Sequence, residues 1–350
     1  MGARPPLSAK LDSTVPPPPA ARRAPPRLSC VIPCRDEAAN LAQLLPQLLD
    51  LLPRLVPGWE LILVDDGSTD DTARLLAAWT RLPGVRALQL SRNFGKEAAL
   101  TAGLQAARGD VVVMMDADLQ HPPALIETFV EHWRRGADVV YARREDRRDE
   151  PALKRLGSQA FYKLLNGLGR GRRFEVPAGA GDFRLLDRRV VDALLALPER
   201  NRFMKGLYAW VGFEARAVPY RPPPRASGAS HYGALRLLRL SLDGLTAFTT
   251  WPLRALSVAG FLLAVPSLAY GAYLTARYLL FGHELSGWTT IVVSLMLFAG
   301  IQLISLGIVG EYVARVYEEV KGRPLYVVRR AWGRGLDDPP PPPPSPPPLP

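Results

Sequence analysis

The residues best suited to chemistry are two aspartates one residue apart, Asp116 and Asp118, which follow the apolar run Val111–Met115. The run is uncharged and begins with β-branched residues, which is typical of a strand buried on both faces of a parallel sheet. Chain direction places both aspartates at the carboxyl end of that strand, where open α/β sheets bind ligands. Two neighbouring carboxylates there suit Mg²⁺ or Mn²⁺ bridging diphosphate oxygens. A D-x-D pair by itself also fits a solvated turn.

Acidic residues follow two further expected strands. Glu37 comes after the strand at 28–32, and Asp65 and Asp66 come after the strand at 59–64. In a doubly wound sheet these ends converge on one crevice. The first strand is not followed by G-x-G-x-x-G, and the chain has no G-x-x-x-x-G-K-[S/T], which disfavours a dinucleotide-binding site and a P-loop. The pattern therefore favours a metal-dependent nucleotide-sugar site.

The elements that must position these residues are strands alternating with helices. Strands are expected at 28–32, 59–64, 85–90, 111–115, 138–142 and 213–220, and helices at 38–52, 97–107 and 122–134. Such alternation predicts an α/β fold with a mostly parallel, doubly wound sheet. Pro46 lies inside the first helical pattern and predicts a kink or a break there.

The composition bounds the class of protein. The chain has 350 residues, is 48% hydrophobic and carries a formal net charge of +11, which suits an anionic partner. Its two cysteines, Cys30 and Cys34, imply neither a disulfide framework nor a zinc site and are compatible with the reducing cytoplasm. No nucleic-acid recognition module is evident, so nucleic acid is not the expected partner.

Two uncharged runs, 255–276 and 288–310, are each long enough to cross the roughly 30 Å of hydrocarbon in a bilayer. The segment between them contains Arg277 as its only lysine or arginine, whereas the outer flanks are rich in both. The positive-inside rule then predicts a multi-pass protein of the cell (inner) membrane with its soluble domain in the cytoplasm. Leucines at helical spacing with interspersed arginines predict an amphipathic interfacial helix within 233–254.

The two termini are rich in proline and are expected to be disordered. The N-terminal segment has arginines and prolines but no apolar core of a signal peptide. The expected organisation is a disordered 1–27, a catalytic domain 28–232, an interfacial segment 233–254, a membrane hairpin 255–310, a juxtamembrane segment 311–330 and a disordered tail 331–350.

Several motifs together resemble one enzyme family. Residues 31–37, 65–70 and 116–120 resemble the signature of glycosyltransferase family 2, which has the GT-A fold. Residues 93–97, 181–188 and 201–207 are similar to the polyprenyl-phosphate (dolichol-phosphate-type) subgroup, especially bacterial undecaprenyl-phosphate glucosyltransferases of the prophage serotype-conversion kind. The resemblance covers roughly residues 28–328, and the joint pattern is far more specific than any single motif.

The resemblance implies inverting transfer of a hexose from a nucleotide sugar, UDP-glucose first, to polyprenyl phosphate at the cytoplasmic membrane face. GDP-mannose and an aminosugar or aminoarabinose donor are the alternatives, and a homo-oligomer such as a tetramer is expected. By motif position, the nucleoside would be held by Pro33, Glu37, Val64 and Asp66. The diphosphate and a Mg²⁺ or Mn²⁺ ion would be held by Asp116, Ala117, Asp118 and Gln120, with Asp116, Asp118 and Gln120 as the metal set. The catalytic set would be Asp118, Arg184, Arg202 and Lys205, with Arg143 as a further residue for the acceptor phosphate.

The chain departs from the family pattern at three places. Arg35-Asp36 stand where Tyr-Asn is usual, His121 replaces an acidic residue, and His231 stands for the lysine of a mobile loop. The third departure leads to the hypothesis that loop closure is weaker or more pH-sensitive. A processive polysaccharide synthase is disfavoured because the chain lacks Q-x-x-R-W and further spans. A catalytically dead membrane anchor on the same fold is the non-enzyme alternative.

Overall fold

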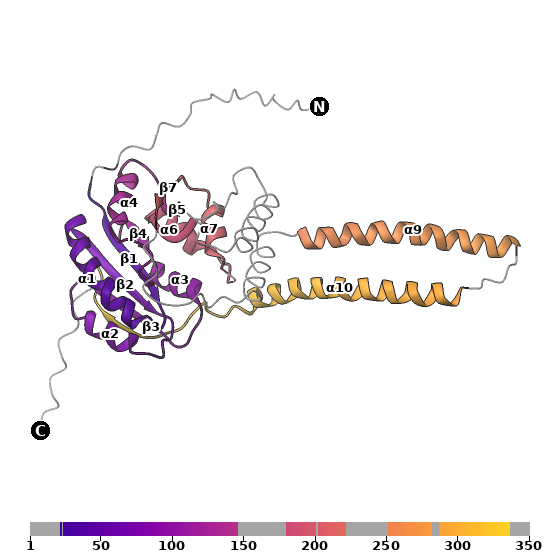
Figure 1. Cartoon of the computed structure of the whole chain (residues 1–350), viewed down its shortest axis with the longest axis horizontal. Coiled ribbons are helices and arrows are strands. Elements are labelled where there is room, and N and C mark those ends of the chain that lie inside the picture. Colours follow the sequence, from indigo (N-terminus) through magenta and orange to yellow (C-terminus); the bar gives the residue numbers. More distant parts are fainter. Residues whose placement is uncertain are drawn as a thin grey trace, which may run out of the picture.

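The computed structural model describes Arg22 and residues 24–145, 180–200, 202–221, 251–281 and 287–336. These residues form an α/β domain from which two long helices project (Figure 1). The strands are β1 Arg27–Cys34, β2 Gly58–Asp65, β3 Val85–Leu90, β4 Val111–Met114, β5 Val139–Arg144, β6 Ala180–Asp187, β7 Ala215–Tyr220 and β8 Val328–Gly333. The helices are α1 Ala38–Leu55, α2 Thr72–Trp79, α3 Lys96–Ala106, α4 Leu125–Arg134, α6 Arg188–Ala196, α7 Met204–Trp210, α9 Trp251–Phe281 and α10 Trp288–Lys321.

The strands form one sheet in the order β7-β5-β6-β4-β1-β2-β3-β8. The pairs β1–β2, β1–β4, β2–β3 and β5–β7 are parallel, whereas β6 runs antiparallel to both β4 and β5, and β8 runs antiparallel to β3. The prediction of an α/β fold with a mostly parallel sheet is therefore confirmed.

Side chains alternate between the two faces of the sheet, and each face has its own layer of helices. On β1, Cys30 and Ile32 pack with α1, α2 and α4, while Val31 between them packs with α3, α6 and α7. On β4, Val113 packs on the same face as Cys30, and Val112 packs on the same face as Val31. Fully buried strands with helices on both faces are the arrangement that near-continuous apolar strands require.

Helix α1 continues through both of its prolines, Pro46 and Pro53. The sequence left a kink or a break open, and the structure assigns one helix of 18 residues. Its buried side chains are Leu41, Leu44, Leu45, Leu48 and Leu52. The packing of this apolar face against the sheet offsets the backbone hydrogen bonds that proline cannot make.

The chain returns from the long helices to complete the sheet through β8, the yellow strand beside β3 in Figure 1. Ser91 donates its backbone N–H to Val327 O at 2.8 Å, just before β8 begins. Beyond β8, Leu336 donates its N–H to Glu60 Oε2 at 3.0 Å, and the other oxygen of this fully buried carboxylate accepts from Ser29 Oγ. The tail that was expected to be disordered from residue 331 is instead held to the domain as far as Leu336, by pairing with β3 through Gly333 and by the hydrogen bond to Glu60.

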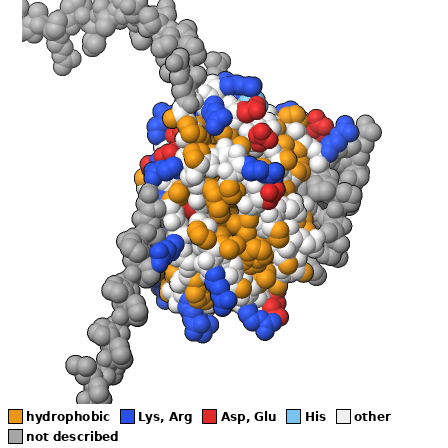
Figure 2. All heavy atoms as spheres, turned by 90° about the vertical axis from the view of Figure 1, so that its left-hand side faces the viewer, with side chains coloured by type: hydrophobic (Ala, Val, Ile, Leu, Met, Phe, Trp, Pro, Cys, Tyr) orange, Lys and Arg blue, Asp and Glu red, His pale blue; other side chains and the backbone are white. Residues whose placement is uncertain are grey.

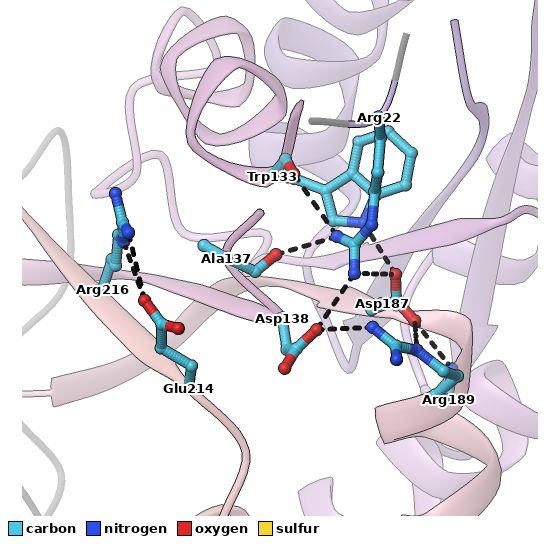
Figure 3. A network of polar contacts seen from close by, with 8 residues as sticks. All are labelled: Arg22, Trp133, Ala137, Asp138, Asp187, Arg189, Glu214 and Arg216. Atoms are coloured by element: carbon cyan, nitrogen blue, oxygen red, sulfur yellow. Dashed lines mark hydrogen bonds and ion pairs between the residues drawn. The ribbon is translucent and has the colours of Figure 1, made fainter. Parts of the chain in front are cut away.

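The folded domain also begins before residue 28, its expected first residue, because Arg22 is bound to it (Figure 3). Its guanidinium lies over the Trp133 ring, 4.7 Å from the ring centroid, and pairs with Asp138 Oδ1 at 3.0 Å and Asp187 Oδ2 at 3.1 Å. Trp133 Nε1 donates to the same Asp187 oxygen at 2.8 Å. This network lies at the edge where β4 and β5 begin, since Asp187 pairs with Val111. Part of the segment 1–27 that was expected to be disordered thus belongs to the folded domain.

Helices α9 and α10 contact each other and form a hairpin that projects from the α/β domain (Figure 1). Large apolar side chains are exposed on both, among them Phe261 (68%), Leu279 (77%), Leu295 (69%) and Leu303 (69%). Among the residues whose side chains are described, one stretch is long and apolar enough to cross a membrane, Leu297–Lys321. The backbone of Arg200 donates to Glu319 Oε1 at 2.9 Å and ties the end of α10 to the domain.

The face of the domain that points away from the hairpin carries hydrophobic side chains near its middle, with Lys and Arg side chains mostly toward its margins (Figure 2). The positive charge of the chain is therefore not confined to the flanks of the hairpin. Residues 233–250 of the predicted interfacial segment 233–254, the loop with His231 and most of the basic stretch after β5 lie outside the described residues, whereas residues 251–254 belong to α9.

Candidate active site

The acidic residues singled out in the sequence lie where β1, β2 and β4 end. Asp66 donates its backbone N–H to Cys34 O at 2.9 Å, and Met115 donates its N–H to Val31 O at 3.1 Å. These bonds extend the parallel ladders one residue beyond the strands, so the loops after all three strands start at the same edge of the sheet. This juxtaposition agrees with the expectation from chain direction.

Asp36 joins the first loop to the second. It has a positive φ of 55°, a conformation that aspartate and asparagine adopt more readily than other non-glycine residues. Its Oδ1 accepts the backbone N–H groups of Thr69 (2.7 Å) and Asp70 (3.3 Å), and its own N–H donates to Ser68 Oγ at 3.0 Å. The departure at position 36 therefore has a structural role, while Arg35 beside it is exposed.

The two aspartates that end β2 have different tasks. Asp65 is fully buried, and its carboxylate accepts from Ser68 N at 2.8 Å and from Gln89 Nε2 at 3.1 Å. These bonds hold the turn after β2. Asp65 is therefore a structural residue of this turn.

Asp66 binds the loop before α3. Its two oxygens accept the backbone N–H groups of Phe94 (2.7 Å) and Gly95 (2.9 Å). Burial raises the pKa of this carboxyl, and the two hydrogen bonds act in the opposite direction. Gly67 beside it has a φ of +69°, and a Cβ there would lie 2.6 Å from the backbone of residue 92. Only glycine lets the loops after β2 and β3 approach this closely.

The D-x-D turn is held in a specific shape. Leu119 has a positive φ of 61°, which is uncommon outside glycine, asparagine and aspartate. Asp118 Oδ1 accepts the backbone N–H of Gln120 at 3.1 Å. Asp116, Asp118 and Gln120 are all partly exposed. A strained turn that presents partly exposed carboxylates is typical of a functional site.

His121 stabilises this turn through a hydrogen bond and ring stacking. It is 8% exposed, its ring stacks on Phe183 at 4.8 Å between centroids, and its Nδ1 accepts the backbone N–H of Asp116 at 3.1 Å. Burial lowers the pKa of the imidazole, although the aspartates nearby act in the opposite direction. His121 is therefore a buried turn residue that positions Asp116.

Glu37 lies within electrostatic range of the D-x-D carboxylates. Burial raises the pKa of its carboxyl, a hydrogen bond from Asn40 lowers it, and the charges of Asp118 and Asp116 raise it further. Three carboxylates from the loops after β1 and β4 thus share one acidic region. Such a region attracts a cation.

The D-x-D residues fit a divalent cation that is completed by a ligand. Within the described residues, no three His, Cys, Asp or Glu side chains gather closely enough to hold a metal by themselves. Mg²⁺, however, is commonly bound through one or two carboxylates plus phosphate oxygens of a substrate. Asp116 and Asp118 offer hard oxygen donors that are open to solvent, with the Gln120 amide beside them.

Lys96, which the sequence reasoning did not include among the site residues, joins this region. Its Nζ lies 2.6 Å from Asp116 Oδ1 and 2.7 Å from Asp182 Oδ2. Burial disfavours the charged form, but the two carboxylates outweigh it and raise the pKa of the ammonium. The motif at 93–97 contained this lysine. The sequence offered no sign that the first residue of α3 would meet aspartates on β6 and after β4.

Glu97 and Asp182 extend the polar cluster beneath Lys96. Burial raises the pKa of Glu97 to about 8, with Asp182 adding to the rise, and its carboxylate accepts the backbone N–H of Met204. Burial opposes ionisation of Asp182, but Lys96 and Lys205 outweigh it and lower its pKa. Glu97 Oε2 and Asp182 Oδ1 are buried and have no hydrogen-bond partner among the described residues.

Arg184 lies inside the domain, next to this cluster. It is 4% exposed, its guanidinium is 3.6 Å from the Tyr208 ring centroid and 6.0 Å from that of Tyr141, and it donates to Gly181 O. Burial lowers its pKa. Its Nε is buried without a partner in the described part of the chain. The predicted contact of Arg184 with a phosphate stays a prediction.

The other predicted basic residues differ in exposure. Arg202 is 8% exposed and donates to the backbone oxygens of Leu197 (2.8 Å) and Glu199 (3.2 Å). Lys205 on α7 is partly exposed, and Arg143 on β5 is exposed. Lys205 is therefore the member of the predicted set that best combines reach with proximity to Asp182.

Pro33, Val64 and Ala117 are buried. Val64 packs in the core on the α3 face of the sheet. Any contact of these three with a nucleotide would involve mainly the backbone. Their predicted binding roles stay predictions.

Comparison with known proteins identifies the family. Residues 29–195 match the family model described as "Glycosyl transferase family 2". The "Uncharacterized glycosyltransferase sll0501" of Synechocystis is 43% identical over 307 residues, 87% of this chain and 96% of that relative. The chain belongs to glycosyltransferase family 2. The resemblance inferred from the short motifs is thereby confirmed, and the protein is a glycosyltransferase.

Other relatives of this glycosyltransferase carry more specific names. The "SfII prophage-derived bactoprenol glucosyl transferase" of Shigella flexneri is 41% identical over 273 residues, 78% of this chain and 87% of the relative. Among solved structures, glucosyl-3-phosphoglycerate synthase from Mycobacterium tuberculosis in complex with Mn²⁺, UDP-glucose and phosphoglyceric acid matches with 24% identity and a TM-score of 0.41, over 63% of this chain and 80% of that one.

Proposed function

We propose that this glycosyltransferase moves a hexose from a nucleotide sugar to a polyprenyl phosphate at the cytoplasmic face of the cell membrane. The transfer inverts the anomeric configuration and depends on a divalent cation. UDP-glucose and undecaprenyl phosphate are the first donor and acceptor to test. One observation carries the proposal: the same chain has carboxylates at one edge of its sheet and a helical hairpin with exposed apolar side chains.

The acidic edge is the donor end of the proposed site. Glu37 and Asp66, with the backbone of the neighbouring loops, would bind the nucleoside. Asp116, Asp118 and Gln120 would hold Mg²⁺ or Mn²⁺, whose chemistry is neutralisation of the negative charge on the departing diphosphate. The partial exposure of these three side chains supports the assignment.

The hairpin supports a membrane-bound acceptor. Large apolar side chains exposed over the lengths of α9 and α10 are unfavourable in water, and lipid would cover them. The proposal is that both helices span the bilayer, with the α/β domain and β8 on the cytoplasmic side. Relatives named bactoprenol glucosyl transferase add support for a lipid-phosphate acceptor.

The proposed step is a single displacement. An oxygen of the lipid phosphate forms a bond to the anomeric carbon of the sugar while the bond from that carbon to the nucleoside diphosphate breaks. The phosphate oxygen is already ionised near neutral pH, so no strong general base is required. Catalysis then rests on orientation and on electrostatic stabilisation, for which Lys205, Arg184 and Arg202 supply positive charge beside the acidic edge.

The sugar donor is identified by a transfer assay. GDP-mannose and an aminosugar or aminoarabinose nucleotide are the alternative donors, and a homo-oligomer such as a tetramer is the expected assembly. Membranes with the overproduced protein would be incubated with undecaprenyl phosphate and a panel of labelled nucleotide sugars. The donor that yields a labelled lipid identifies the sugar.

The matched pair Asp118→Ala and Asp50→Ala tests the site. Asp50 is an exposed residue of α1 that pairs with Arg54 in the next turn, so its loss removes the same charge far from the sheet edge. Transfer should be abolished by Asp118→Ala and kept by Asp50→Ala, with both proteins inserted in membranes. Wild-type transfer by Asp118→Ala at saturating metal would refute the assignment.

A further inference from the structure

Lys96 forms an ion pair with Asp116, one of the two carboxylates that are proposed to bind the cation. Its ammonium bridges Asp116 (2.6 Å) and Asp182 (2.7 Å), whose side chains are 27% and 14% exposed. Lys96 itself is 43% exposed, so a ligand can still reach it.

The same lysine is connected to the nucleoside end of the site. It follows Gly95 directly, and Gly95 and Phe94 donate their backbone N–H groups to Asp66. Movement of Asp66 would therefore shift the start of α3 and the Lys96 side chain with it. Two predicted ligand-binding carboxylates, Asp66 and Asp116, are thus linked through three consecutive loop and helix residues, 94–96.

We propose that Lys96 is a positioning residue that holds Asp116 in place of a divalent cation until a nucleoside diphosphate enters the site, and so makes metal and nucleotide bind together. The inference rests on the proposed function, because it needs a nucleotide-sugar donor. It assigns to Lys96 a control over the order of binding, which the family motifs do not assign.

The argument is one of charge. With Lys96 paired to Asp116, a divalent cation at Asp116 and Asp118 would lie a few ångströms from an ammonium and be repelled by it. A diphosphate brings negative oxygens that can bind both positive charges at once and remove the repulsion. Asp182 gives the ammonium a second anchor, so Lys96 stays at the site when Asp116 turns to the metal.

The test is the affinity of the full-length protein in detergent for Mn²⁺ alone and for Mn²⁺ with UDP. The concentration of free Mn²⁺ is measured from its electron paramagnetic resonance signal. In the wild type, UDP should tighten Mn²⁺ binding by roughly 5- to 150-fold, the usual range of coupled sites. In Lys96→Met, Mn²⁺ alone should bind about tenfold tighter or better, because one unit charge is removed beside a divalent cation, and the further gain from UDP should shrink.

Three further variants serve as controls for the Lys96→Met measurement. Lys96→Arg keeps the charge and should keep the weak binding of Mn²⁺ alone. Arg54→Met removes an exposed charge on α1 and should leave both affinities unchanged. The double variant Lys96→Met/Asp182→Asn removes the buried carboxylate that loses its partner, and it should show the same tight metal binding if the single variant does not fold.

The outcomes separate a control role from a structural one. A purely structural loss would weaken Mn²⁺ binding with and without UDP, and unchanged or weaker binding of Mn²⁺ alone in the folded variants overturns the inference. Failure of sugar transfer to undecaprenyl phosphate, with the Lys96-dependent coupling intact, would overturn the proposed acceptor and leave the inference standing. A wild type that binds no Mn²⁺ even with UDP would overturn the inference and the proposed metal dependence together.

Discussion

Gly67 offers a sharp test of how the loops at the acidic edge are assembled. It lies between Asp66 and the turn after β2, and its φ of +69° places it in the left-handed region. An alanine Cβ would lie 2.6 Å from the backbone carbon of Arg92 and 2.7 Å from the nitrogen of Asn93. Both distances are too short for unbonded atoms, so Gly67→Ala must displace the loop before α3.

Gly212 is a matched control because it has the same φ of +69°, and the nearest atom to its Cβ position is 3.9 Å away. Both substitutions carry the left-handed penalty of about 1–2 kcal/mol. Gly67→Ala adds an overlap with backbone atoms, for which overpacking values of about 1–3 kcal/mol apply. At about 2–4 °C per kcal/mol, Gly212→Ala should lower the Tm by about 2–8 °C and Gly67→Ala by about 4–20 °C.

The functional effect should be confined to Gly67. Displacement of residues 92–93 pulls the N–H groups of Phe94 and Gly95 away from Asp66, so UDP affinity should fall roughly tenfold or more, as for loss of one hydrogen bond to a charged group. Titration calorimetry on the detergent-purified protein measures it. Equal Tm losses for the two variants, with UDP affinity unchanged by Gly67→Ala, would refute the reasoning.

Three further predictions concern stability. Glu97→Gln should flatten the pH dependence of the Tm between about pH 4.5 and 8, because the folded state raises the pKa of Glu97 to about 8 and its stabilisation is lost as the pH rises through that value. Arg22→Met should destabilise the domain by about 1.5–3 kcal/mol through lost charged hydrogen bonds, measured by thermal unfolding, without changing UDP affinity. Glu60→Ala should leave the N–H of Leu336 without its acceptor and speed tryptic cleavage near the C-terminal end of β8.

Each of these has a contrary result. A Tm that falls with rising pH as steeply in Glu97→Gln as in the wild type would assign the effect to another group. Asp182 cannot be that group, because its pKa is lowered and its titration lies below its ordinary value of 3.8. Weaker UDP binding in Arg22→Met would contradict the position of Arg22 at the far edge of the sheet. Unchanged proteolysis in Glu60→Ala would mean that pairing with β3 alone holds β8.

The amino-acid sequence by itself determined the parallel part of the fold and the acidic edge. The apolar runs within β1, β2 and β4 are buried on both faces, so their composition alone identifies them, and chain direction puts Asp116 and Asp118 at the carboxyl end of β4. The family could also be inferred, because several short motifs occur together in the right order. These features depend on residues close together in the chain.

Tertiary structure alone decided the rest. Strand β8, with two arginines and a mostly exposed surface, has no strand pattern of its own and forms because the edge of β3 is open to pairing. Lys96 meets Asp116 and Asp182 only because β6 inserts antiparallel beside β4 and α3 packs on the same face. Contacts between groups so far apart in the chain depend on strand order, and no local pattern of residues encodes that order.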